Sequence, residues 1–161
     1  SVWSQEQAPA HLVDGAGMMG TLHDNHYAAA TMWHTTERPA ARPSVAGLPA
    51  SPAWVRFDFA QPQDIEAILI WNLNQQKFTD RGFRKVRIYC SQDGTTWKPL
   101  TDPKTIELAP ADASPLIGPT TVLNDFTEHT FKSVIIAAEE MDGNYGGNAF
   151  GLSAVRFVQK H

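Results

Sequence analysis

Amide, arginine and aromatic side chains gather in three short stretches that lie far apart along this sequence. The stretches are "TMWHT" (31–35), "WNLNQQKFTDRGF" (71–83) and "DGNYGGNAF" (142–150). Amides donate and accept hydrogen bonds together, and arginine offers a planar fork of donors. Such groups suit sugar hydroxyls, while an aromatic ring can pack on the apolar C–H face of a pyranose. The residue types therefore predict recognition of a hydroxyl-rich ligand.

The middle stretch supplies two amides and a cation. Asn72 and Asn74 follow an apolar run, and because side chains alternate along a strand, both should lie on one face. Arg81 follows beside Gly82, which permits a tight turn. Sugar binding and simple capping of a loop are both consistent with these residues.

The last stretch places one tyrosine between two asparagine–glycine elements. Tyr145 could serve as a ring platform, with Asn144 and Asn148 as donors at its sides. Gly146 and Gly147 would let the backbone approach a ligand closely. The alternative is a glycine-rich turn that carries an incidental tyrosine.

Histidines gather in the first part of the chain and raise a metal hypothesis. His23, Asp24, His26 and His34 offer imidazole and carboxylate ligands, as zinc prefers. Their spacing matches no zinc signature, so loop histidines are the favoured interpretation. Trp33 and His34 fit better as a ring and a hydrogen-bonding group at the end of a strand.

Catalysis finds little support in the sequence. Glu139 and Glu140 are adjacent in a predicted strand, where alternation directs their side chains apart. Cys90 lies on an inward strand position and resembles a small hydrophobe more than a nucleophile. No phosphate-binding glycine loop or serine nucleophile elbow occurs. We therefore expect a binding domain and not an enzyme.

Charge and composition limit the classes of partner that this chain is expected to bind. The formal net charge is −4 and no Lys/Arg-rich run occurs, so a nucleic-acid partner is not expected. No stretch approaches the roughly 20 apolar residues of a membrane helix, so no transmembrane segment is expected. The N-terminal residues lack a signal-peptide pattern, and any targeting segment should lie outside this chain. The single cysteine excludes an intrachain disulfide without deciding the compartment.

Short apolar-alternating runs separated by turn residues dominate the chain. A hairpin is predicted at 83–100, with its turn at Asp93–Gly94, and a turn of helix at 21–30. The other predicted strands are 54–59, 65–74, 131–140 and 152–158. The proline-rich segments between them should be surface loops. This pattern predicts an all-β fold, a β-sandwich or jelly roll.

Five motifs in order resemble one family. They are "HLVDGAGM", "MWHT", "PAWVRFDFAQPQDIEAILIWNLN", "RGFRKVRIYCSQDGTTWKPL" and "NYGGNAFGLSAVRF". Their order resembles discoidin domains, also called coagulation-factor V/VIII C-type domains. The resemblance runs from Leu12 to Val158 and is strongest to bacterial members attached to glycan-degrading enzymes. It implies a single galactose-binding-domain-like β-sandwich of about eight main strands, spanning 1–161 with its core at about 12–158.

The same resemblance implies a function and a site. It implies a non-catalytic carbohydrate-binding module of an exported bacterial protein, located outside the cell, in the periplasm or at the cell surface. Its partners would be a glycan and a tethered catalytic domain, which it would bring to the substrate. The implied sugar-binding residues, on loops at one end of the sandwich, are Trp33, His34, Asn72, Asn74, Arg81, Asn144, Tyr145 and Asn148.

The sequence leaves open whether the domain binds a structural calcium and whether it has a different function. Many family members hold a structural calcium through the aspartate of the "L.DG" turn and a glutamate in the last strand. Asp14 occupies the first position, but Ala154 stands where the glutamate is expected. Calcium bound by Asp14 is therefore an expectation that lacks one carboxylate. The alternative function is an adhesion domain that binds a protein or lipid surface, as animal discoidin relatives do.

Overall fold

The computed structural model describes residues 7–28, 30–101, 105–126, 128–140 and 142–160. Their regular secondary structure is almost entirely β-strand, with short 3-10 turns at η2 (Pro9–Leu12) and η3 (Thr79–Arg81). The strands are β1 (Met18–Met19), β2 (Leu22–His23), β3 (Trp33–His34), β4 (Arg42–Pro43), β5 (Ala50–Ser51), β6 (Trp54–Asn72), β7 (Lys85–Ser91), β8 (Lys98–Pro99), β9 (Thr105–Glu107), β10 (Thr121–Leu123), β11 (Thr130–Ala138) and β12 (Gly151–Gln159). The all-β prediction is confirmed, but the helical turn predicted at 21–30 is wrong, because the described residues of that segment form β2, turns and irregular backbone.

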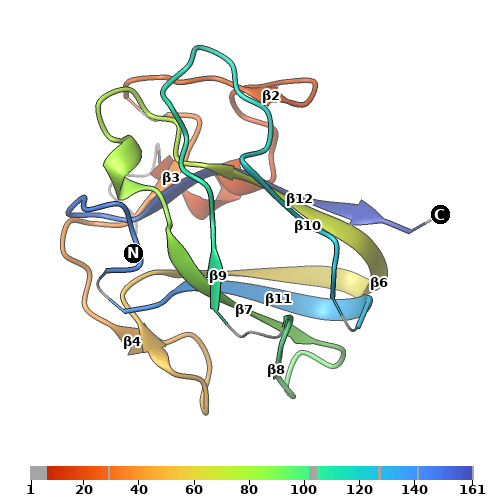
Figure 1. The fold of residues 1–161 in the computed structure, drawn as a ribbon. Helices are drawn as coiled ribbons and strands as arrows, with labels where there is room; N and C mark the ends of the chain where they lie inside the picture. Colours follow the sequence, from red (N-terminus) through yellow and green to blue (C-terminus); the bar gives the residue numbers. More distant parts are fainter. Residues whose placement is uncertain (1–6, 29, 102–104, 127, 141, 161) are drawn as a thin grey trace.

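Two predicted strands prove to be one long strand, β6, which bends and belongs to both layers of a sandwich (Figure 1). Its first part, 54–58, pairs with β11, which pairs in turn with β7. Its second part, 65–72, pairs with β12, and residues 68–70 pair with β10. Every pairing between these strands is antiparallel. The bend therefore joins the layers β10–β6–β12–β3 and β6–β11–β7–β8 through one continuous backbone.

The core between the layers follows the predicted alternation. In β7 the buried inward residues are Val86, Ile88 and Cys90. The outward face of the β6–β11–β7 layer is also covered, because Val45 and Leu48 pack on it around the buried Ile135. The long segment between β3 and β6 thus shields a sheet face, a role that its proline-rich sequence did not predict.

The thiol of Cys90 is expected to react slowly while the protein is folded. Its side chain is 3% exposed, and burial raises the pKa of the thiol to about 11. The reactive thiolate is therefore scarce at mildly alkaline pH. Alkylation by iodoacetamide, followed by mass spectrometry, should be at least about a hundredfold slower in buffer than in urea. Equal rates in the two solvents would contradict this prediction.

Candidate functional site at the loop end of the sandwich

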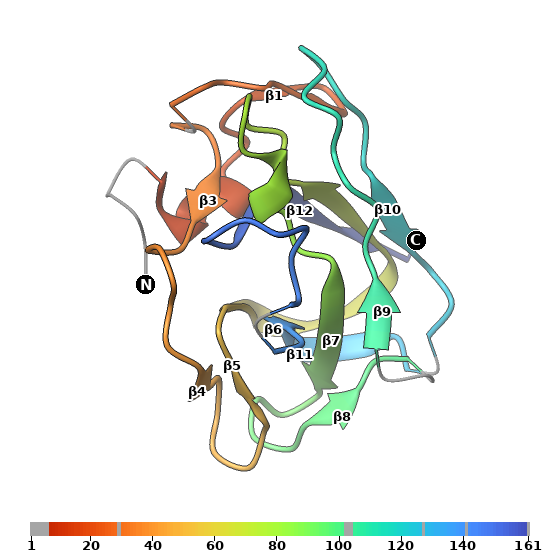
Figure 2. The same ribbon diagram turned by 60° about the vertical axis from the view of Figure 1, so that its left-hand side comes forward.

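The three polar stretches of the sequence do meet at one end of the sandwich. Gly151 pairs with His34 and also bridges to Gly82, which joins the first two stretches to the start of β12. The Gly147 N–H donates to the Asp80 carbonyl at 3.0 Å and ties the last loop to η3. Figure 2 shows β3, the segment around η3 and the loop before β12 side by side.

Asn72 lies fully buried beneath this end of the molecule. Its Nδ2 donates to the carbonyls of Phe83 at 2.7 Å and Ala109 at 2.9 Å. Its Oδ1 accepts the Leu73 N–H at 2.9 Å. Both amide protons are already used, so Asn72 holds three backbone segments together. Sugar binding by Asn72 stays a prediction, and this geometry favours the capping alternative.

Asn74 fastens a different pair of segments. Its Nδ2 donates to the Asp24 and Ser114 carbonyls, both at 2.9 Å, and its side chain is fully buried. Its backbone N–H donates to the Ser153 hydroxyl at 3.0 Å. Asn74 therefore joins the loops that precede β3 and β10 to the exit of β6.

Asn144 organises the glycine-rich loop from inside. Its Nδ2 donates to the Gly147 and Ala149 carbonyls, each at 2.8 Å, and its Oδ1 accepts the Gly146 N–H at 3.0 Å. Its side chain is 6% exposed. The glycines let the chain fold tightly around this amide, because Gly146 has a φ of 108°.

The two predicted ring platforms are not freely displayed. Trp33 is 2% exposed and stacks on Phe83, with the ring centroids 5.8 Å apart. Tyr145 is half-buried, and its hydroxyl donates to the Leu108 carbonyl at 2.5 Å. Burial raises the pKa of the Tyr145 phenol. Both rings contribute to packing, and a role in sugar binding stays a prediction for each.

His34 lies buried under the loop end, with 1% of its surface exposed. Burial, and next the nearby Arg81 guanidinium, lower the pKa of the imidazole to about 4, with a smaller opposing effect of Gln75. Neither ring nitrogen has a hydrogen bond of normal geometry to any part of the chain that the structure describes. His34 is therefore a neutral, buried polar group beside Arg81.

Of the predicted residues, Asn148 is exposed at this end, and Arg81, like Tyr145, is only partly exposed. The Arg81 guanidinium lies 4.2 Å from the centroid of the Phe78 ring, and its Nη2 lies 3.7 Å from Glu37 Oε1. Its side chain is 12% exposed. Asn148 is exposed, while its carbonyl accepts the Arg38 N–H at 2.6 Å. Both can offer donors to a ligand that lies on the loops.

Sequence reasoning missed the aromatic residues that this end displays. Tyr27 is 51% exposed, and its ring centroid lies 5.9 Å from that of Phe78. The Lys77 ammonium sits 5.5 Å from the centroid of the Tyr27 ring. The available signal was an isolated aromatic residue inside each of two polar loops, "NHYAAAT" and "QQKFTDR". We call Tyr27, Glu37, Lys77, Phe78, Arg81 and Asn148 the loop-end surface.

The surroundings of Asp14 do not by themselves fit calcium. Asp14 Oδ2 lies 2.9 Å from His11 Nδ1, and Oδ1 accepts the Ala16 N–H at 2.8 Å. Among the described residues, no three His, Cys, Asp or Glu side chains are grouped to hold a metal ion. Calcium takes about six to eight oxygen ligands. Calcium at Asp14 stays a prediction, and it would depend on backbone and water oxygens.

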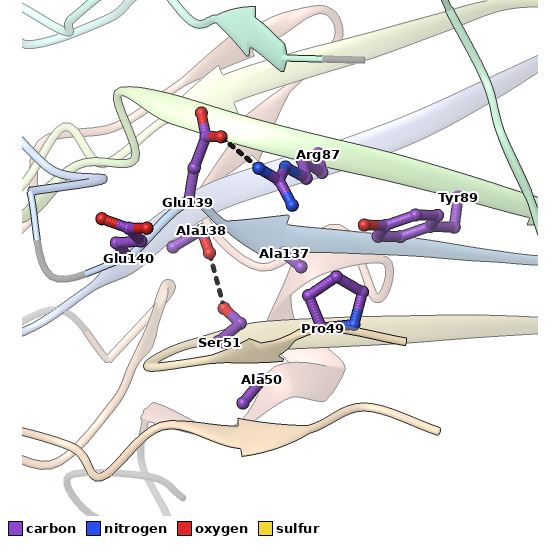
Figure 3. A pocket seen from close by; sticks show the side chains of 9 residues that line it. All are labelled: Pro49, Ala50, Ser51, Arg87, Tyr89, Ala137, Ala138, Glu139 and Glu140. Atoms are coloured by element: carbon purple, nitrogen blue, oxygen red, sulfur yellow. Dashed lines mark hydrogen bonds and ion pairs between the residues drawn. The ribbon is translucent and has the colours of Figure 1, made fainter. Parts of the chain in front are cut away.

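A small hollow lies elsewhere, at the seam between the β4–β5 hairpin and β11 (Figure 3). It measures about 80 Å³, and Pro49, Tyr89 and Glu140 contribute to its wall. The Arg87 guanidinium donates to Glu139 Oε1 at 2.5 Å, and the Ser51 hydroxyl donates to the Ala138 carbonyl at 2.7 Å. These polar groups bond to one another, and the Ser51 bond fastens the β4–β5 hairpin to β11.

Comparison with known proteins decides the family. The family model of the F5/8 type C domain matches residues 1–151. The chain belongs to this family. The prediction of a discoidin domain is therefore confirmed. No curated protein sequence matches the chain. None of the helices in the described part of this F5/8 type C domain is long and apolar enough to cross a membrane.

Solved structures share the fold of this F5/8 type C domain. One is a family 32 carbohydrate-binding module of a family 31 glycoside hydrolase, bound to GalNAc, with a TM-score of 0.60 and 15% sequence identity. The match covers 98% of the present chain and 91% of that module. A pectin-binding module has a TM-score of 0.56 and 23% identity, with coverage of 100% and 88%. A family 89 glycoside hydrolase from Clostridium perfringens has a TM-score of 0.61 and 13% identity, and the chain spans 14% of its length.

Proposed function

We propose that the loop-end surface binds a glycan and that the domain has no catalytic activity of its own. The observation that carries this proposal is the half-exposed Tyr27 ring, which lies beside Phe78 and Lys77, while Arg81 lies over the Phe78 ring. It is supported by the fold, which the chain shares with modules described as GalNAc-bound and pectin-binding. A ring flanked by cationic and amide donors suits the apolar face and the hydroxyls of a sugar.

Binding of a single sugar should be weak. The surface is shallow, and water competes for each hydrogen bond that Lys77, Arg81 or Asn148 could donate. We expect dissociation constants of roughly tens of micromolar to millimolar for a monosaccharide. Binding of this strength is useful when the module is tethered to another domain, because the tether raises the local concentration.

A finer proposal concerns the whole protein. We propose that the domain brings an exported bacterial glycan-active enzyme to its substrate, outside the cell, in the periplasm or at the cell surface. It is supported by the resemblance to a domain that forms a small part of a longer glycoside hydrolase. A pull-down of insoluble glycan by the full-length protein, with and without this domain, tests this role.

Tyr27→Ala is expected to weaken glycan binding by about tenfold or more, because the ring supplies the stacking surface. A glycan microarray first identifies the ligand, and titration calorimetry then compares the wild type with Tyr27→Ala and Phe78→Ala. Val158→Ala, at the far end of β12, is the matched control for loss of an exposed apolar group and should bind normally. A folded domain that binds no glycan, or variants that bind as the wild type does, would overturn the proposal.

A lipid surface is the second candidate ligand. The β1–β2 hairpin, drawn in red-orange in Figure 1, carries exposed Met19 and Leu22, with 67% and 40% of their surfaces accessible. Apolar side chains at a protruding tip can insert between lipids. The acidic net charge opposes binding to anionic lipid. Sedimentation with neutral and anionic vesicles, compared with Met19→Asp, tests this candidate.

A further inference from the structure

In the part of the chain that the structure describes, residues 54–59 of β6 form an edge of their layer. β11 pairs with one side of it, from Trp54↔Ala137 to Asp58↔Ser133. No strand in the described part of the chain pairs with the other side, since β10 and β12 pair with 65–72. Proteins commonly protect such edges with lysine, proline or a bulge. Residues 54–59 contain neither lysine nor proline, and the irregularity of β6 against β11 begins only after Asp58. Among the described residues, the stretch 54–58 is therefore open to a further strand.

The register identifies which backbone groups point outward at this edge. The Ala138 N–H donates to the Ala53 carbonyl at 2.8 Å. In an antiparallel pair, alternate residues direct their backbone groups to the partner strand. Val55 and Phe57 therefore direct theirs to β11, and Trp54, Arg56 and Asp58 direct theirs to the open side. These groups form a regular row that another strand can pair with.

An apolar hollow accompanies the edge. It measures about 430 Å³ and lies between β6, the end of β12 and the segment around η2. Its apolar lining residues are Pro9, Ala10, Val13, Val55, Phe57, Phe59 and Phe157. Val13 is 60% exposed beside it. A strand that pairs with this edge therefore needs apolar side chains on the face that points to the hollow.

We propose that a second copy of this chain pairs with this edge, antiparallel and centred on Phe57. In this register Arg56 lies opposite the partner's Asp58, and Asp58 lies opposite the partner's Arg56. Val55 then lies opposite the partner's Phe59, on the side of the hollow. Centring the pair on Arg56 or on Asp58 would place like charges opposite each other, which is unfavourable. The segment "VRFDF" is thus complementary to itself in one register.

The backbone and the hollow agree with this register. Arg56 and the partner's Asp58 both present their backbone groups to the open edge, so each such pair exchanges two N–H···O bonds. The partner's Val55 and Phe59 project on the same side as Phe57 and cover the hollow. The β6–β11–β7–β8 layers of the two copies then form one continuous sheet across a two-fold axis, which gives a closed, isologous dimer.

Charge reversal at this edge tests the proposal. Sedimentation velocity of the wild type, from micromolar to millimolar concentration, is expected to show a monomer–dimer equilibrium. Arg56→Asp or Asp58→Arg places like charges opposite each other at both symmetry-related pairs and should weaken the dimer by at least about tenfold. The double exchange Arg56→Asp/Asp58→Arg restores opposite charges and should recover the dimer.

The control variant disrupts an exposed ion pair that lies away from the proposed interface. Arg56 and Asp58 also pair within one chain, with Nη2 2.8 Å from Oδ1. The exposed Arg84–Glu107 pair, at 2.9 Å, is of the same kind, so Arg84→Asp should leave the dimer unchanged. Circular dichroism confirms that each variant is folded. A wild type that stays monomeric, a dimer that neither single reversal weakens, or a double exchange that fails to recover it would each overturn the proposal.

Discussion

Asn72→Ala, at the last residue of β6, is expected to lower the free energy of unfolding by about 3–4 kcal/mol. The substitution removes the donors to the Phe83 and Ala109 carbonyls and the acceptor of the Leu73 N–H. The residue is fully buried, so these backbone groups lose their partners in a place that water reaches poorly. A buried polar group without a partner costs about 1–3 kcal/mol.

Asn72→Asp separates hydrogen bonding from side-chain volume. Aspartate has nearly the same shape, but an ionised carboxylate cannot donate to the two carbonyls and would bring a negative charge towards them. We expect it to destabilise the fold at least as much as alanine does. If the destabilisation came only from the cavity that alanine leaves, Asn72→Ala would be the less stable of the two variants. The comparison therefore shows whether lost hydrogen bonds or lost volume destabilise the fold.

Asn148→Ala is the matched control, since Asn148 is exposed on the same end of the molecule. We expect its free energy of unfolding to stay within about 0.5 kcal/mol of the wild type. Urea denaturation of the three variants, followed by tryptophan fluorescence, gives the comparison. A change of less than about 1 kcal/mol in Asn72→Ala would show that the amide does not hold these loops together.

The strands could be predicted from the sequence because a strand's side-chain period of two is a local property. Val86, Ile88 and Cys90 alternate inward as expected. The union of two predicted strands into β6 could not be predicted in this way. It depends on pairing with β11 at one end and β12 at the other, and both partners lie far away in the sequence.

The candidate site shows a similar division. The meeting of three distant loops followed from the family resemblance, and Arg81 keeps a small exposed part there. Whether an amide faces a ligand or its own backbone depends on carbonyls far along the chain, such as Ala109 for Asn72. Tyr27 lies in a loop without periodicity, so only its isolation among polar and small residues indicated that it would be displayed.

Lowering the pH from about 7 to about 4.5 is expected to reduce the free energy of unfolding by about 2–3 kcal/mol, through His34 alone. The folded protein holds the pKa of His34 at about 4, against an ordinary value of 6.5. Above pH 6.5 the imidazole is neutral in both states, so its contribution is at its maximum. Between the two values the unfolded chain binds a proton that the folded chain excludes, and stability falls until the pH passes below about 4.

His34→Gln should flatten this part of the pH profile, whatever it does to stability at neutral pH, because the slope depends on a titrating group. His26→Gln, at an exposed position, should keep the wild-type slope. The pKa of the Asp58 carboxyl is lowered in the folded protein, so its stabilising effect is lost only as the pH falls below its unfolded pKa of about 4. That loss lies below the range from pH 7 to pH 4.5 in which His34 titrates. A wild-type slope that His34→Gln leaves unchanged would show that the ring is protonated in the fold. It would also mean that Arg81 and the burial of His34 do not exclude the charge.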